Sequence, residues 1–363
     1  IALVDVLVDK QKKLEEGLLV LPMMQAAVRR LPDDVDLAIE ALVVEALVDN
    51  ERHLKREGAK RTERAFALAL SREPVSPTLI ARAGNLHVIL LYLTGQYPAA
   101  IAALQRTRSA LVSSSAHPHI RLAYLDNSLG LAHWASGDIE EAERAFASAI
   151  EVIEAQRAPH SHETLWAAPL GNLAALALQQ GHLDLAAQRA TQVDLMLDRT
   201  VGPNHPRHAY TDEVLALVAA AEGKYAEARR ILRAWRVRHR DREGHELAIS
   251  AALLELVVQL EATRGKAVRR FEAAISSLAP ESETGVAERQ VSFVAAAYLG
   301  GDDERAQLAL AAARDHASQG HLSPSTATLL EAMGRVISGG SCEEAPTWHP
   351  LSRLVGSACR ARR

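Results

Sequence analysis

Three histidine-containing phrases are the part of this 363-residue sequence with the most evident capacity for chemistry. They contain the pairs His117/His119, His160/His162 and His205/His208. Paired imidazoles can bind zinc, but zinc needs four ligands, or three and an open position, and no cysteine lies near any pair. Proline suits the first turn of a helix, where its missing N–H is not needed. Because Pro118 and Pro206 stand inside these phrases, we interpret them as helix-start junctions and predict neither a metal nor a cofactor.

Catalytic motifs are the second kind of chemistry to consider. A nucleophile needs a base beside it, and that base needs an orienting carboxylate. The sequence has no G-x-S-x-G, P-loop, G-x-G-x-x-G or H-E-x-x-H motif. We predict no catalytic residues, so the segment itself is not expected to be an enzyme.

A basic run, Arg229 to Arg242, contains seven arginines and Trp235. Arginine with an interleaved aromatic residue could bind phosphate, so a nucleic-acid-responsive module is one alternative function. Asp241 and Glu243 partly neutralise the run, and a solvated outer helix face explains it as well. Nucleic acid is therefore not the expected partner.

The composition favours helices and excludes some classes of protein. Aromatic residues make up 4% and charged residues 24%, and the formal charge is -4. Low aromatic content disfavours strands, and this charge attracts neither nucleic acid nor an anionic membrane. No apolar run is long enough to cross a bilayer, and the two cysteines, Cys342 and Cys359, make no disulfide framework. We expect a cytoplasmic protein with no membrane partner, and the first residue, Ile1, suggests that an upstream segment is missing.

A repeat organises the middle of the chain. Glycines recur at intervals of 42, 44 and 42 residues, and each is followed five residues later by alanine. A glycine can end a helix in the left-handed conformation, and a small alanine lets a second helix approach the first closely. The pairs are Gly95/Ala100, Gly137/Ala142, Gly181/Ala186 and Gly223/Ala228. Each hairpin has an apolar stripe that it cannot bury alone, which predicts stacking into a solenoid.

The clearest unit resembles a tetratricopeptide repeat (TPR). Its matching residues are Leu129, Gly130, Gly137, Ala142, Phe146 and Ala149. The usual unit has about 34 residues, and the longer unit here resembles the repeats of kinesin light chains and of bacterial signalling proteins. The resemblance covers residues 80–240 and implies an all-α fold, a right-handed α-solenoid of antiparallel helix hairpins that binds protein partners.

Outside that region the register loosens, and we divide the chain accordingly. The predicted parts are an N-terminal helical lead-in (1–32), a degenerate helix pair (33–76), core repeats (77–242), two divergent repeats (243–320), a capping helix (321–338) and a flexible tail (339–363). In the second-to-last hairpin, Ala267, Phe271 and Ala274 are expected to lie on a separate second helix.

The inner, concave face of such a solenoid is lined by the first helix of each hairpin. We number each repeat so that its turn glycine is position 15. Positions 2, 5, 9 and 12, on the first helix, are then expected to face the groove. In kinesin-light-chain-like repeats an asparagine matching Asn172 holds a peptide backbone. The predicted groove residues are Arg82, Asn85, Tyr92, Tyr124, Asn127, Trp134, Asn172, Tyr210 and Glu213. Asparagine amides would hold an extended peptide while aromatic rings grip its side chains. Trp134 could equally pack between helices.

These patterns predict a protein-interaction scaffold or regulatory module of a bacterial signalling protein that binds a peptide or protein segment. One alternative is the C-terminal regulatory part of a Ser/Thr protein kinase, which requires that a kinase lysine and a catalytic-loop aspartate be encoded upstream of Ile1. Self-association through a terminal repeat is left open.

Overall fold

The computed structural model describes residues 2–5, 7, 14–52, 54–73, 76–114, 120–155, 163–203, 205, 207–238, 245–277, 283–318, 322, 324–342 and 350–362. Within these ranges the chain is helical and contains no strand, which confirms the predicted all-α class. The chain divides into two compact units, Ile1–Arg157 and Ala158–Arg363. The division falls inside the predicted block 77–242, so the two units are described separately.

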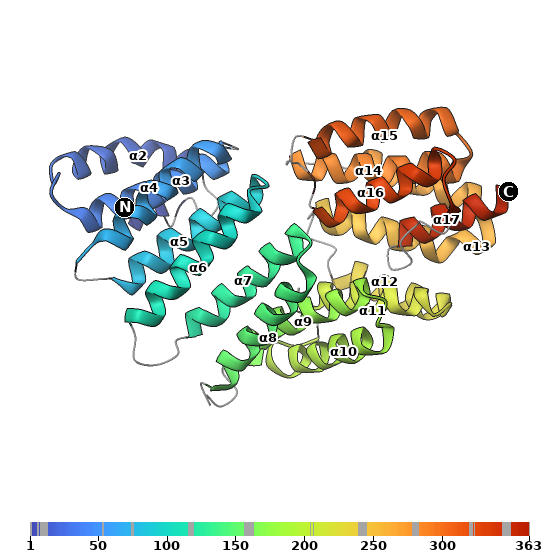
Figure 1. Ribbon diagram of the computed structural model, residues 1–363, viewed down its shortest axis with the longest axis horizontal. Helices are drawn as coiled ribbons and strands as arrows, with labels where there is room; N and C mark the ends of the chain where they lie inside the picture. Colours follow the sequence, from blue (N-terminus) through green and yellow to red (C-terminus); the bar gives the residue numbers. More distant parts are fainter. Residues whose placement is uncertain are drawn as a thin grey trace. The chain divides into compact units, whose positions relative to one another are not determined.

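The first unit consists of consecutive antiparallel hairpins (Figure 1). Two N-terminal helices precede three hairpins, α3/α4, α5/α6 and α7/α8. The helices are α1 (Ala2–Asp5), α2 (Leu14–Arg29), α3 (Val35–Glu51), α4 (Lys55–Ser71), α5 (Pro77–Leu93), α6 (Tyr97–Ser114), α7 (Ile120–Ser136) and α8 (Ile139–Ala155). One apolar core runs through α3 to α7, from Ile39 to Ala132.

The second unit begins with two further hairpins, α9/α10 and α11/α12, and continues with a long helix and a C-terminal group (Figure 1). Its helices are α9 (Glu163–Gln179), α10 (Leu183–Thr200), α11 (His208–Ala221), α12 (Tyr225–Arg238), α13 (His245–Ser277), α14 (Glu283–Gly300), α15 (Asp303–Ser318), α16 (Pro324–Ile337) and α17 (Pro350–Arg362). Their largest apolar cluster joins α13 to α17.

The four repeat glycines end helices as predicted. Gly95, Gly137, Gly181 and Gly223 have φ values of 73°, 88°, 80° and 78°, which is the left-handed region. After each glycine, the next backbone N–H donates to a carbonyl five residues back, for example Asp138 N to His133 O at 2.9 Å. The alanines five residues on (Ala100, Ala142, Ala186 and Ala228) are fully buried. The hairpin turn and the close helix crossing predicted from the sequence are thus confirmed.

A second class of glycine lies where helices of one hairpin touch. A Cβ on Gly130 would come within 2.5 Å of the Phe146 ring, and one on Gly84 within 2.5 Å of Thr107 Oγ1. Both contacts are far shorter than van der Waals contact, so neither site has room for a side chain. Gly130 is the residue that follows leucine in the repeat pattern, which explains its place there.

The helix expected to begin near Ala267 is not a separate element. Residues His245–Ser277 form one continuous helix of 33 residues, α13. Gly265, in its interior, is not among the positive-φ glycines. A glycine inside a helix costs only about 1 kcal/mol relative to alanine, and apolar residues of α13 are buried on both sides of Gly265. Leu254, Val257 and Val258 belong to an apolar cluster with α11 and α12, and Phe271 and Ile275 belong to another with α14 to α17.

The prediction of a flexible tail over residues 339–363 is wrong for its last part, residues 350–362. Pro350–Arg362 form α17, in which Leu351, Val355 and Ala358 are almost fully buried. A disulfide joins Cys342, beyond α16, to Cys359 on α17. Disulfides persist in oxidising compartments. The low cysteine count, taken alone, favours a reducing compartment such as the cytoplasm, and this disulfide removes that support. Among the described helices, none is long and apolar enough to cross a bilayer.

Candidate functional site

The first helices of the hairpins in the first unit, α3, α5 and α7, contact one another in that order, and their shared exposed side is called the inner face here, after the predicted groove. Arg82 Nη1 on α5 lies 3.2 Å from Glu40 Oε2 on α3. At the start of the same face, Arg121 Nη1 on α7 donates to Thr78 Oγ1 on α5 at 3.4 Å. Because polar contacts join each helix to the next, the three helices lie side by side and present one surface. Arg82 contributes to holding that surface together.

Four predicted or adjacent residues on α5 and α7 are exposed on this face. Asn85 is exposed, and the exposed fractions of Ile89, Tyr92 and Tyr124 are 50%, 37% and 53%. Asn85, Ile89 and Tyr92 lie three to four residues apart, so they follow one stripe of α5. The Tyr92 ring packs edge-on against Tyr97, with centroids 5.4 Å apart, which fixes its orientation. The face therefore offers an amide, an aliphatic side chain and two phenol rings.

Two predicted residues on α7 are less accessible. Asn127 and Trp134 are half-buried, and the Trp134 ring packs edge-on against Phe146 with centroids 6.3 Å apart. An indole held against a fully buried ring contributes to the hairpin core. Trp134 thus has at least a packing role, which the sequence left as the alternative.

A buried carboxylate beneath this face was not predicted. Asp126 is 2% exposed; it accepts a hydrogen bond from Arg108 Nε at 2.7 Å and another from Ser148 Oγ at 2.8 Å. These donors belong to α6 and α8, so Asp126 joins three helices. Arg108 and Ser148 are 18 and 22 residues away from Asp126 in the sequence, so no local sequence pattern predicts this network.

A buried histidine, also missed, lies between α4 and α5. His87 Nδ1 is 3.1 Å from Thr62 Oγ1, and its ring centroid lies 5.9 Å from that of Phe66. Burial lowers the pKa of His87 below its usual value, because the charged imidazolium would lose hydration there. The group is therefore a core residue kept neutral and does not belong to the inner face.

The remaining predicted groove residues belong to the second unit. Asn172 on α9 and Glu213 on α11 are half-buried, and Tyr210 on α11 is 66% exposed. Tyr210 and Glu213 lie one turn apart on the same side of α11. The predicted set is thus divided between a group on α5 and α7 and a group on α9 and α11.

The histidine phrases lie mostly outside the described residues, as do His117, His119, His160, His162 and Pro206. His208 is described and fully buried. Its Nδ1 is 2.5 Å from Asp194 Oδ1 and its Nε2 is 3.1 Å from the Gly202 carbonyl, so both ring nitrogens have protein partners. In the described part of the chain, no group of three or more potential ligand side chains could hold a metal.

The basic run is described only in part. Arg229, Arg230 and Arg233 are exposed on α12, whereas the side chains from 236 to 242 lie outside the described set. Arg229 Nη2 donates to the Val258 carbonyl on α13 at 3.4 Å, and Arg230 lies 3.8 Å from Glu227. Arg229 and Arg230, two of the three arginines of the basic run whose side chains are described, thus have contacts within the protein.

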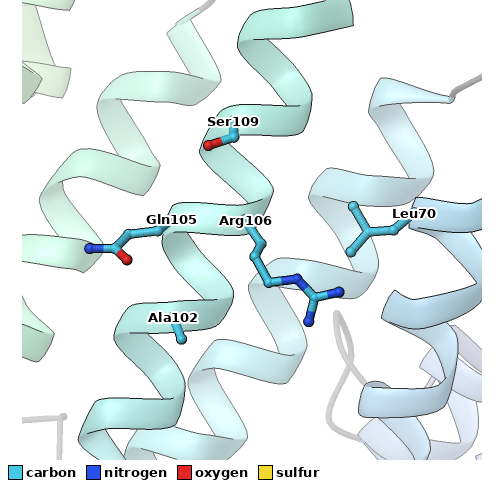
Figure 2. A pocket seen from close by; sticks show the side chains of 5 residues that line it. All are labelled: Leu70, Ala102, Gln105, Arg106 and Ser109. Carbon is cyan, nitrogen blue, oxygen red and sulfur yellow. The ribbon is translucent and has the colours of Figure 1, made fainter.

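Two hollows are present on the described surface. One, of about 420 Å³, lies on the second helices α4 and α6. Figure 2 shows Arg106 extending across it toward Leu70, while Gln105 points away. Arg106 lies over the Phe66 ring, with its Cζ 5.4 Å from the centroid. The other hollow, of about 350 Å³, lies among α10, α11 and α12 and is lined by both acidic and basic side chains.

Comparison with known proteins places the fold in the class of all-helical TPR-like solenoids. RapI in its apo form has a TM-score of 0.63 and 13% identity, with 85% of this chain and 83% of RapI covered. The quorum sensor NprR from B. thuringiensis has a TM-score of 0.61 and 12% identity, with 85% of this chain and 84% of that one covered. The Rap conjugation gene regulator of plasmid pLS20 has a TM-score of 0.54 and 14% identity, over 79% and 77% of the two chains.

These likenesses confirm the predicted fold, and at such identities they show the fold alone. No protein-family model matches the sequence, and no curated protein matches it.

Proposed function

We propose that this chain is a protein-interaction module, without catalytic chemistry of its own, that binds an extended peptide segment on the inner face of its first unit. The observation that carries the proposal is the stripe of Asn85, Ile89 and Tyr92 on α5 with Tyr124 beside it on α7. Single exposed apolar residues are ordinary on any protein. Here an asparagine and three exposed apolar side chains lie on neighbouring helices of one face.

The chemistry of the stripe suits a peptide. An asparagine side chain has both a donor and an acceptor, so Asn85 can pair with a peptide backbone whatever its sequence. Ile89 and the two tyrosines lose exposed apolar area when a side chain packs on them, and tyrosine is enriched among residues that dominate binding energy. Backbone contacts would hold the segment and ring contacts would select it.

One of the structurally similar proteins, the pLS20 Rap regulator, is solved in complex with the Phr* peptide, and another Rap protein is solved with the competence and sporulation factor. A fold of this kind can therefore accommodate such ligands. The chain would then act as a scaffold or regulator in bacterial signalling, with Asn127 as a further contact residue on the same face. Fusion to a kinase domain remains a hypothesis that sequencing upstream of Ile1 tests.

The experiment compares two equally exposed aliphatic residues. A ligand is first selected from a random peptide library displayed against the intact chain. Its affinity is then measured for Ile89→Ser, alone and together with Tyr124→Ser, and for Val112→Ser. Ile89 on first helix α5 and Val112 on second helix α6 are both 50% exposed, so Val112→Ser is a matched control. We expect Ile89→Ser together with Tyr124→Ser to weaken binding by about tenfold or more, as loss of a central contact does.

Val112→Ser should leave the affinity unchanged, and circular dichroism should show equal helix content for all variants. Equal affinity of the Ile89/Tyr124 variant and the parent protein would refute the inner face as the binding site. A similar loss in Val112→Ser would refute it as well, because the ligand would then depend on the second-helix side.

A further inference from the structure

Helix α2 has apolar side chains on the side that faces away from the other described helices. It packs on α1 and α3, and it lies along the edge of the first unit (Figure 1). Leu19 is 79% exposed and Met23 is 72% exposed, and Pro22 beside them is exposed as well. Residues three and four apart are neighbours on a helix surface, so these side chains form one patch. Leu19, Pro22 and Met23 are called the α2 patch here.

The α2 patch differs from the outward side of another helix in the same unit. On α4 the exposed residues include Arg56, Lys60 and Arg64, which follow one another at intervals of one helical turn. A helix at the edge of a repeat array needs a polar outer face if the array is to stay soluble by itself. Exposed apolar residues that stand alone need no explanation, whereas adjoining ones indicate an interaction surface. The α2 patch therefore favours a partner that covers it.

Charged side chains of opposite sign stand on either side of the α2 patch. Glu15 precedes Leu19 by one helical turn, and Arg30 follows Ala26 by the same interval, just beyond the last residue of α2. Both charged side chains are exposed. Positions 15, 19, 22, 26 and 30 are three or four residues apart, which places them along one side of the helix. This order of charges also suits the helix dipole, but the dipole does not account for the apolar residues between them.

The order of charges is complementary to itself when two copies of α2 lie antiparallel. A two-fold axis at the centre of the patch, between Pro22 and Met23, places each residue before it level with the residue equally far after it. Glu15 of one copy then lies level with Arg30 of the other, and the same pair recurs at the opposite end. Both ends of the contact are thus matched by one arrangement.

The same axis matches side chains by size. Leu19 of one copy lies level with the small Ala26 of the other, so the two helices can approach closely and remove Leu19 from water. A two-fold contact uses the same surface on both copies, which a self-complementary surface permits. We propose that the α2 patch is an interface between two copies of this chain, with α2 antiparallel to its symmetry mate and Glu15 of each copy paired with Arg30 of the other.

A lipid surface is a poorer occupant for this side of α2. Helices that lie on membranes have an excess of lysine and arginine on their polar face. On α2 and the residue after it, Glu15 and Glu16 balance Arg29 and Arg30. A second copy uses both signs of charge, whereas an anionic membrane would repel one of them.

The first test measures self-association of the full chain by sedimentation equilibrium over a wide range of concentrations. A contact made by one helix from each copy is expected to be smaller than the standard interface of about 1,600 Å², so the dimer should dissociate on dilution. Leu19→Ser with Met23→Ser should raise the dissociation constant by about tenfold or more, because the centre of the contact is lost. Leu308→Ser is the matched control, since Leu308 on α15 is 68% exposed and lies far outside α2 in the sequence. It should leave the dissociation constant unchanged.

The second test reverses the charges. Glu15→Arg alone and Arg30→Glu alone each place like charges opposite one another at both ends, so neither variant should self-associate as the parent does. Mixed in equal amounts, the two variants should form a heterodimer, because one then has two basic ends and the other two acidic ends. Native mass spectrometry of the mixture identifies that species if the two variants carry tags of different mass. Circular dichroism should show equal helix content for all variants.

Several outcomes would overturn the proposal. One is a parent protein that stays monomeric at every concentration, and another is a dimer that Leu19→Ser with Met23→Ser leaves unchanged. Two charge variants that do not associate when mixed would exclude the antiparallel pairing. Binding of a monomeric parent to phosphatidylcholine vesicles, lost in Leu19→Ser with Met23→Ser, would assign the patch to a membrane.

This interface does not depend on the peptide site proposed for the inner face. Ile89→Ser with Tyr124→Ser should leave the dissociation constant of the dimer as in the parent protein. The two proposals can therefore fail separately.

Discussion

At the scale of single residues, the glycines of this chain have two different functions that the sequence does not separate. The turn glycines are needed for their backbone conformation, and Gly130 is needed for its lack of a side chain. Gly171, inside α9, has neither requirement, because a Cβ there would meet no atom within 4 Å and its φ is not positive. The two helical glycines therefore make a matched pair.

Gly130→Ala should lower the free energy of unfolding by about 1–3 kcal/mol, because the new methyl group forces the Phe146 ring out of its place. Gly171→Ala should raise it by about 0.4–1 kcal/mol, since alanine restricts the unfolded chain and fits the helix. Thermal and urea unfolding followed by circular dichroism measure both changes. Equal stability of the two variants would mean that the helix crossing at Gly130 relaxes freely.

Also at this scale, the sequence predicts some site residues and not others. Asn85, Tyr92 and Tyr124 could be placed on an exposed face because helical spacing alone decides which side of α5 or α7 they occupy. Asp126 could not be recognised, since its environment depends on α6 and α8, whose approach is set by packing.

At the scale of elements, the helix hairpins were predictable and the C-terminal helices were not. Each turn is encoded locally by glycine and the alanine five residues later. α13 has no such encoding, because its continuity depends on packing at both of its ends. α17 was missed because polar residues and arginines dominate its sequence, while the buried Leu351, Val355 and Ala358 form only a narrow stripe.

The disulfide between Cys342 and Cys359 fastens α17 to the rest of the second unit. Its cysteines are 17 residues apart, and closing a loop of that size stabilises a protein by about 3 kcal/mol in the chain-entropy description. We expect dithiothreitol to lower the melting temperature of the protein. The double variant Cys342→Ala/Cys359→Ala should melt at a lower temperature and be insensitive to the reductant.

If the reductant shifts the double variant as much as the parent, the effect does not come from this disulfide. Counting free thiols in protein taken directly from cells would show whether the pair is oxidised there. A fully reduced pair would mean that α17 is held by its apolar stripe alone.

At the scale of the whole molecule, the solenoid class follows from periodicity, whereas the division into two units does not. The repeat continues from Gly95 to Gly223, and the interval that contains residue 157 is only two residues longer than the intervals on either side of it, which does not mark a boundary. A boundary between compact units is decided by which cores are continuous in space, and four similar hairpins give the same local pattern on both sides of it. The comparisons extend the fold over most of the chain and leave the binding site to experiment.

In the second unit, α13 contributes to two apolar clusters, one with α11 and α12 and the other with α14 to α17. Phe271→Ala should remove about 3–5 kcal/mol from the second cluster. We expect amide hydrogen exchange to become faster in α11 and α12 as well as in α14 to α16. Faster exchange confined to α14–α16 would show that the two ends of α13 open independently.

An ordinary repeat array frays from its ends, one hairpin at a time, because each hairpin depends only on its neighbours. Helix α13 belongs to two apolar cores, so it cannot unfold without disrupting both of them. Stepwise fraying from the C-terminal end is therefore prevented. Helices α11 to α17 should therefore open as one cooperative unit, and a partner that stabilises any of them would slow the opening of all.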